Sequence, residues 1–146
     1  MIINLDEIKT LIPHRDPFLF IDKCEIIISG KEGIGERLFL SKEYFFRGHF
    51  PKMPIVPGVV LIESMAQTAG IVVSKKYENF EDKSVLFMSV NKAKFRKPVY
   101  PNDKIFFHVK YIQSVKSVYK FSGIATKNNI KVCECEFSAM ISHKQS

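Results

Sequence analysis

The feature that most constrains this chain is a nearly continuous apolar run, Val59 to Val73, which follows a loop rich in proline and glycine. Three prolines and two glycines among residues 48–58 exclude a regular helix in that loop. The run itself has apolar residues on almost every side of a helix, and such a helix is buried. It is too short and too polar to cross a bilayer. We therefore predict one buried helix, from about Pro57 to Tyr77, as the centre of the fold.

Two ionisable side chains stand out in this stretch. Glu63 is the only charged residue between Lys52 and Lys75, and His49 lies in the loop that enters the helix. An unpaired buried carboxyl group favours its protonated form, so Glu63 is a candidate proton donor, and His49 is a candidate base at neutral pH. The helix start at Gly58 offers free N–H groups to a developing oxyanion. The alternative is that the Glu63 side chain lies at a solvent-exposed edge of the helix and His49 lies on the surface. Neither residue would then have a chemical role.

The rest of the chain is dominated by segments that favour strands. Residues 4–12 predict a short helix capped by Asn4, and Glu78 to Lys83 predict a charged loop. The segments that predict strands are 18–29, 34–40, 84–97, 104–113, 118–126 and 130–142. Such strands around one long apolar helix indicate a single α+β domain over residues 1–146, with an antiparallel sheet wrapped on the helix.

Composition restricts the partners and the compartment. The net charge is +7, but the basic residues are scattered and form no nucleic-acid recognition motif, so an acidic protein or substrate explains the charge as well. An odd number of cysteines argues against a disulfide framework, and Cys133 and Cys135 lack the further ligands of a zinc site, so we expect them to pack in the core. The N-terminus lacks the features of a signal peptide, which predicts a cytoplasmic protein without membrane insertion.

Three motifs make the chain similar to the (3R)-hydroxyacyl-acyl-carrier-protein dehydratases of the FabZ type. In the order of that family, they are LIPHRDPFLFID at 11–22, GHFPKMPIVPGV at 48–59 followed by LIESMAQ at 61–67, and FRKPVYPND at 95–103. The chain departs from the family at a few positions. Asp16 replaces a usual tyrosine, Lys52-Met53 replaces a commoner Gly-Arg pair, and Asn102 replaces a usual glycine.

The resemblance implies a hot-dog fold, a homodimer with a continuous sheet, and a trimer of such dimers. It implies that water is removed from a (3R)-3-hydroxyacyl thioester on the acidic acyl carrier protein, which gives the trans-2-enoyl thioester of type II fatty acid synthesis. No metal or redox cofactor is implied. In this reaction His49 takes the proton α to the thioester, Glu63 protonates the leaving hydroxyl group, and the Gly58 N–H binds the carbonyl oxygen. The resemblance also implies that His49 and Glu63 of one site come from different subunits.

Other residues are candidates for contacts with the acyl chain or the carrier protein. Phe45 and Phe46 either line an acyl pocket or anchor the loop before His49. Arg96 and Lys97 lie in the third motif and predict a positive rim for the acidic carrier, and Tyr100 in the same motif is a further candidate contact. By contrast, we expect His14 in the first motif to shape the site without a catalytic role.

Three alternative functions remain at this point. Two are other hot-dog enzymes, namely a dehydratase that also isomerises the double bond and an acyl thioesterase. The isomerising relatives carry aspartate at the position of Glu63, so the glutamate argues against that activity. The third alternative is a non-catalytic module that binds an acyl carrier protein or RNA, in which His49 and Glu63 are incidental.

Overall fold

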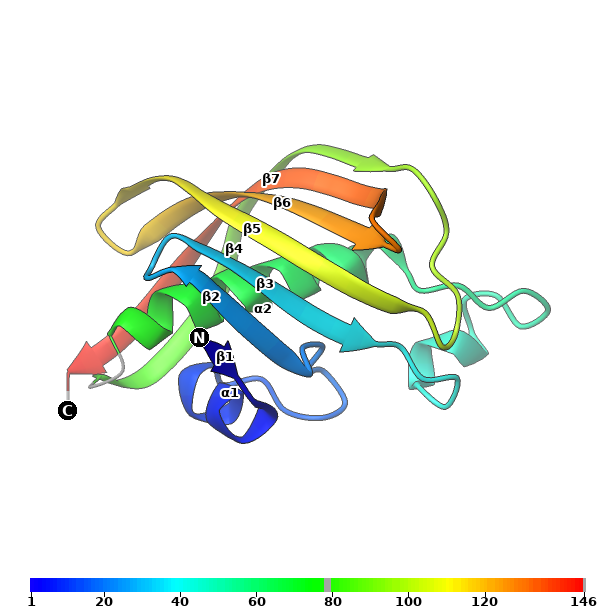
Figure 1. Cartoon of the computed structure of the whole chain (residues 1–146), viewed down its shortest axis with the longest axis horizontal. Coiled ribbons are helices and arrows are strands. Elements are labelled where there is room, and N and C mark those ends of the chain that lie inside the picture. Colours follow the sequence, from blue (N-terminus) through cyan, green and yellow to red (C-terminus); the bar gives the residue numbers. More distant parts are fainter. Residues whose placement is uncertain (78–79, 146) are drawn as a thin grey trace.

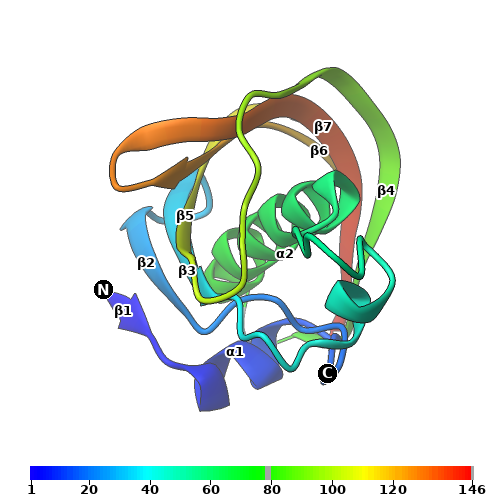
Figure 2. The same ribbon diagram turned by 90° about the vertical axis from the view of Figure 1, so that its right-hand side faces the viewer.

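The computed structural model describes residues 1–77 and 80–145. In this part of the chain an antiparallel sheet curls around one long helix, α2 (Gly58–Lys76) (Figures 1 and 2). The sheet has seven strands in the order β1-β2-β3-β5-β6-β7-β4, so β4 lies at one edge. The strands are β1 (Ile2–Ile3), β2 (Lys23–Ile28), β3 (Glu32–Leu38), β4 (Phe80–Phe95), β5 (Lys104–Val115), β6 (Val118–Lys127) and β7 (Ile130–Gln145). A short helix, α1 (Leu5–Leu11), packs on α2 beside the open side of the sheet.

The central helix confirms the main prediction from the sequence. Every residue from Val60 to Ser74 except Glu63 is buried, as expected for a helix that is apolar on nearly all sides. The helix is one residue shorter than predicted at each end, because Pro57 is its N-cap and Tyr77 its C-cap. Neither this helix nor another in the described part of the chain is long and apolar enough to span a membrane.

Glycines on the inner face of the sheet allow α2 to pack closely against the strands. A Cβ atom on Gly35 of β3 would lie 2.3 Å from Oγ1 of Thr68. A Cβ atom on Gly123 of β6 would lie 2.6 Å from the sulfur of Met65. Both distances are shorter than atoms in contact allow, so a larger residue at either position requires the facing side chain of α2 to move or the helix to shift away from the sheet.

We expect the substitution Gly35→Ala to destabilise the fold by about 1–3 kcal/mol, because the added methyl group must push α2 away from β3. The measurement is the free energy of unfolding by denaturant titration. Gly48→Ala is a matched control, since a Cβ atom there meets nothing within 4 Å. Equal stability of the two variants would contradict the close packing of helix and sheet.

The first strand prediction is only partly correct. The segment 18–29 was expected to be extended throughout, but β2 begins at Lys23. The backbone before it bonds instead to the side chain of Gln67 on α2, whose Oε1 accepts from the N–H of Phe20 at 2.8 Å and whose Nε2 donates to the carbonyl of Phe18 at 2.9 Å. Because a helix side chain satisfies these backbone groups, the segment follows α2 rather than the sheet.

The loop predicted over Glu78 to Lys83 is wrong from Phe80 onward. Residues 78 and 79 lie outside the described residues, and β4 begins at Phe80, which pairs with Gln145 of β7. The charged residues of this segment suggested a loop, but pairing with β7 continues the strand through them.

The predicted helix near the N-terminus is confirmed as α1. The side chain of Asn4 caps it, because it accepts a hydrogen bond from the N–H of Glu7 at 3.0 Å.

The three cysteines are free and buried, and for Cys133 and Cys135 this agrees with the expected packing role. Burial raises the pKa of the Cys24 and Cys133 thiols to about 12 and that of the Cys135 thiol to about 11. These thiols therefore stay protonated and unreactive at neutral pH.

Candidate active site

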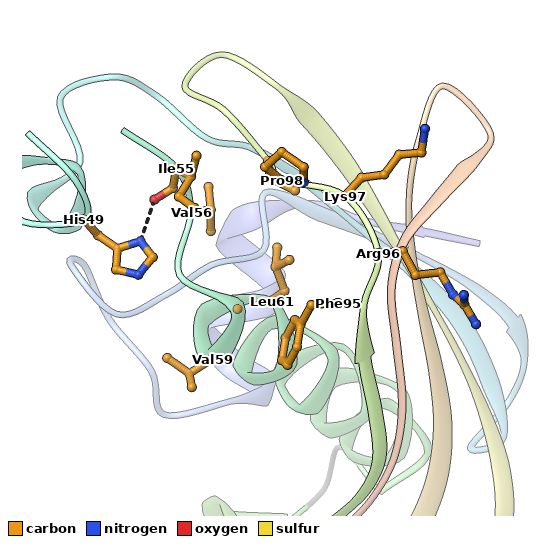
Figure 3. A pocket seen from close by; sticks show the side chains of 11 residues that line it. His49, Ile55, Val56, Val59, Leu61, Phe95, Arg96, Lys97 and Pro98 are labelled. Atoms are coloured by element: carbon orange, nitrogen blue, oxygen red, sulfur yellow. Dashed lines mark hydrogen bonds between the residues drawn. The ribbon is translucent and has the colours of Figure 1, made fainter. Parts of the chain in front are cut away.

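His49 is held in one orientation by the loop between the 3-10 helix η1 (Tyr44–Arg47) and α2. Its backbone N–H donates to the carbonyl of Phe45 at 3.1 Å, and its own carbonyl accepts from the N–H of Ile55 at 2.8 Å. The Nδ1 atom of the ring lies 3.2 Å from the carbonyl oxygen of Ile55 (Figure 3). Because a carbonyl oxygen can only accept, Nδ1 carries the hydrogen, and Nε2 keeps the free electron pair that a base needs.

An ion-pair network anchors the chain that leads into this loop. Arg37 of β3 bridges the carboxylates of Asp22 and Glu43, with 2.9 Å to Asp22. The other oxygens of these carboxylates accept backbone hydrogen bonds from Leu38 and Leu40, each at 2.8 Å. The network therefore fixes the exit of β3 and the start of η1, and with them the approach to His49.

His49 and Gly58 line one cavity of about 450 Å³ (Figure 3). Gly58 is the first residue of α2, so its N–H is among those that have no partner within the helix. A Cβ atom on Gly58 would lie 2.4 Å from the ring of Phe95, which shows how closely this strand approaches the helix start. The full lining is His49, Ile55, Val56, Gly58, Val59, Leu61, Phe95, Arg96, Lys97, Pro98 and Val99.

Glu63 lines another cavity, of about 670 Å³, with mostly apolar walls. These walls are Phe18, Tyr44, Phe45, Pro57, Val59, Val60, Ile62, Phe87 and Val90. The expectation of an unpaired carboxyl group is wrong. The Glu63 side chain is 17% exposed, its Oε2 accepts from Nε2 of Gln67 at 3.0 Å, and Nε2 of His14 lies 3.3 Å from the same oxygen. Gln67 is one helical turn from Glu63, whereas His14 reaches it only through the packing of the first loop on α2.

Within one chain, His49 and Glu63 therefore face different cavities. Val59 is the residue that lines both, and it is 72% exposed. The structure thus brings His49 to the predicted oxyanion donor Gly58, but not to the predicted acid. Among the described residues, no group of three His, Cys, Asp or Glu side chains is placed to hold a metal ion.

The two phenylalanines before His49 have different positions. Phe45 lines the cavity of Glu63, as an acyl-pocket residue would. Phe46 is 5% exposed and packs against Phe45, with 4.8 Å between ring centroids, so its position is that of a loop anchor. The sequence left both roles open for the pair, and each residue fits one of them.

Arg96 and Lys97 lie at the rim of the His49 cavity, with their charged ends pointing away from His49 (Figure 3). The guanidinium of Arg96 donates to Glu134 at 2.9 Å, and this hydrogen bond, helped by Lys131, lowers the pKa of Glu134 to about 2. Part of the charge of Arg96 is therefore neutralised at neutral pH, whereas the structure gives no such carboxylate partner to Lys97 among the described residues.

Tyr100 lines neither of these cavities. It faces a separate hollow of about 460 Å³ together with Lys97 and Lys127. The nearby departure from the motif, Asn102, has a φ of 70°. This left-handed conformation suits glycine and is tolerated by asparagine. The turn can therefore keep the same backbone conformation with Asn102 in place of the usual glycine.

Comparisons with known proteins now identify the family. The model of the FabA-like domain matches residues 12–136. The 3-hydroxyacyl-[acyl-carrier-protein] dehydratase FabZ of Gluconobacter oxydans is 46% identical over 140 residues, which are 95% of this chain and 83% of the relative. The chain belongs to the FabZ dehydratase family. The FabZ of Gluconacetobacter diazotrophicus is 45% identical, with 95% of this chain and 87% of the relative covered.

Solved structures agree on the architecture of this FabZ family member. A structure of the dehydratase heterocomplex ApeI:P from Xenorhabdus doucetiae matches with a TM-score of 0.75 at 12% identity, over 92% of this chain and 90% of that chain. A hypothetical thioesterase with coenzyme A from Streptococcus pneumoniae matches with a TM-score of 0.62 at 12% identity, over 84% and 88% of the two chains. These similarities concern the fold alone, and they confirm the predicted hot-dog fold.

Proposed function

We propose that this chain, acting as one domain, dehydrates (3R)-3-hydroxyacyl-acyl-carrier-protein to the trans-2-enoyl product in fatty acid synthesis. Its FabZ relatives carry that dehydratase activity in their names. The observation that carries the proposal is that His49 lines the same cavity as the start of α2, with an Nε2 atom that has no hydrogen-bond partner among the described residues. Nε2 of His49 removes a proton from C2, and the carboxyl group of Glu63 protonates the hydroxyl group on C3, which leaves as water. The N–H of Gly58 stabilises the charge on the thioester oxygen.

The complete site requires a second copy of the chain, because His49 and Glu63 face different cavities of one subunit. The edge strand β4 supports a dimer, since it bonds to β7 on one side and, among the described residues, has no strand partner at its other edge. Among its described side chains, five apolar ones are between 38% and 58% exposed, namely Leu86, Phe87, Met88, Val90 and Phe95. Pairing of β4 with its copy would cover these residues, extend the sheet, and join the two kinds of cavity at Val59. We propose this homodimer as the catalytic unit, and a trimer of dimers as its higher assembly.

The direct test is an assay with a purified (3R)-3-hydroxyacyl thioester. Dehydration raises the ultraviolet absorbance of the enoyl thioester without releasing a thiol, whereas a thioesterase releases the thiol and a binding module does neither. An isomerising dehydratase would in addition give the 3-enoyl product, which chromatography separates. Thiol release without enoyl product would overturn the proposed activity.

The acidic carrier is proposed to dock at the rim formed by Arg96 and Lys97. We expect the double change Arg96→Glu, Lys97→Glu to raise KM for the carrier-bound substrate more than KM for a short pantetheine-linked substrate, because only the carrier presents a large negative surface. The effect should diminish with added salt. Lys116→Glu is a suitable control, because this lysine lies in the β5–β6 turn at the opposite end of the sheet (Figure 1). Equal changes in both KM values would place the docking surface elsewhere.

The cytoplasm is the compartment that we propose for this activity. The three cysteines are free, which fits a reducing environment.

A further inference from the structure

His14 and Gln67 converge on a single oxygen of Glu63. Nε2 of Gln67 donates to Oε2 at 3.0 Å, and Nε2 of His14 lies 3.3 Å from that same Oε2. Gln67 is fully buried and also binds the backbone of Phe18 and Phe20, so its amide cannot turn away. The side chain of His14 is only 12% exposed. The carboxyl group therefore has one oxygen with two nitrogen neighbours and one oxygen, Oε1, with no partner among the described residues.

The state of the His14 ring follows from its second nitrogen. Nδ1 is buried and has no hydrogen-bond partner among the described residues. A hydrogen on this atom would be a buried donor without an acceptor, which is costly. The hydrogen of the neutral ring therefore belongs on Nε2, the atom that faces Glu63. The guanidinium of the neighbouring Arg15 does not compete for this contact, because it donates to the backbone carbonyls of Lys9, Ile12 and His14.

We propose that His14 is a positioning residue which, together with Gln67, determines the oxygen of Glu63 that carries the reactive proton. This inference rests on the proposed role of Glu63 as the acid. A protonated carboxyl group has one accepting oxygen and one hydroxyl oxygen. Gln67 donates a hydrogen bond to Oε2, and Nε2 of His14 lies 3.3 Å from the same oxygen, so Oε2 is the accepting oxygen and the proton is on Oε1. Oε1 then faces the substrate with its proton, whereas with Gln67 alone the carboxyl group can rotate and exchange its two oxygens.

The test compares two replacements of His14 in the full-length oligomer, with a hydroxyacyl-pantetheine substrate. We expect His14→Phe to lower kcat about tenfold, because the close contact of Nε2 with Oε2 is lost, with KM changed less than about twofold. His14→Gln should recover most of kcat, because its amide nitrogen can occupy the position of Nε2. His108→Phe is the matched control, since Nε2 of His108 lies 2.6 Å from Oε2 of Glu32 in a second histidine–glutamate pair on β5 and β3. This control should leave kcat unchanged.

Each outcome of this experiment has a defined meaning. If Glu63→Gln stays active, the acid assignment fails, and the role of His14 fails with it. If Glu63→Gln is inactive while folded His14→Phe has the wild-type kcat, only the role of His14 is overturned. A His14→Gln variant as slow as His14→Phe also overturns it. In the Glu63→Gln background, His14→Phe should cause no further loss. If His14→Phe melts below the control, His14→Asn replaces it, because its shorter amide does not reach Oε2 and should be equally slow.

Discussion

The variants His49→Ala and Glu63→Gln should each lose dehydratase turnover by about 10²–10⁴-fold while remaining folded, since each removes one general acid–base group. The alanine leaves no base beside the helix start, and the glutamine amide keeps the shape of Glu63 but cannot donate a carboxyl proton. His49 is half-buried in a loop and Glu63 faces a cavity, so neither change leaves a large void in the core. The measurement is the initial rate of enoyl absorbance at saturating substrate.

Melting temperature and oligomer size would show that these two variants are intact. His108 on β5 is a suitable control, because it lines neither of the two cavities. His108→Ala should therefore keep the wild-type rate. Turnover near the wild-type value in a folded His49→Ala or Glu63→Gln protein would refute the assignment of that residue.

Mixing the two inactive variants should restore activity to about a quarter of the wild-type value. In a shared-site dimer of one His49→Ala subunit and one Glu63→Gln subunit, one site receives both defects and the other receives neither. Random reassociation makes about half of the dimers mixed, and half of their sites are intact, which gives the expected quarter. The physical basis is the separation of His49 and Glu63 into different cavities of one chain, on either side of the exposed Val59.

The mixing experiment uses reversible dissociation followed by mass spectrometry to confirm the mixed dimers. Its matched control pairs His49→Ala subunits with subunits that carry both changes, because every resulting site then lacks the histidine and no activity can return. If sites were built within single chains, the mixture of the two single variants would stay inactive as well. That result, with mixed dimers confirmed, would contradict the shared site but would leave the dehydratase activity untouched.

The central helix was predictable from sequence because it depends on a local pattern. The apolar run from Val59 to Val73 is stable only as a buried helix. The Pro57-Gly58 pair determines where this helix begins. The single carboxylate in that run and the single histidine in the preceding loop were visible for the same reason. The hot-dog fold and the dehydratase family followed from the resemblance of three motifs, and the comparisons confirm both.

Tertiary structure alone decided how the polar groups around Glu63 are paired. His14 and Glu63 are 49 positions apart, and their contact depends on how the first loop packs on α2, which no local periodicity encodes. The same packing explains why the predicted strand does not begin at Phe18. The backbone groups of Phe18 and Phe20 form hydrogen bonds with the side chain of Gln67 on α2. Sequence patterns report which residues prefer to be buried, whereas the partner of a buried polar group is chosen by the global arrangement of the chain. The separation of His49 from Glu63 in one subunit is a property of this second kind, because it depends on which side of α2 each side chain meets.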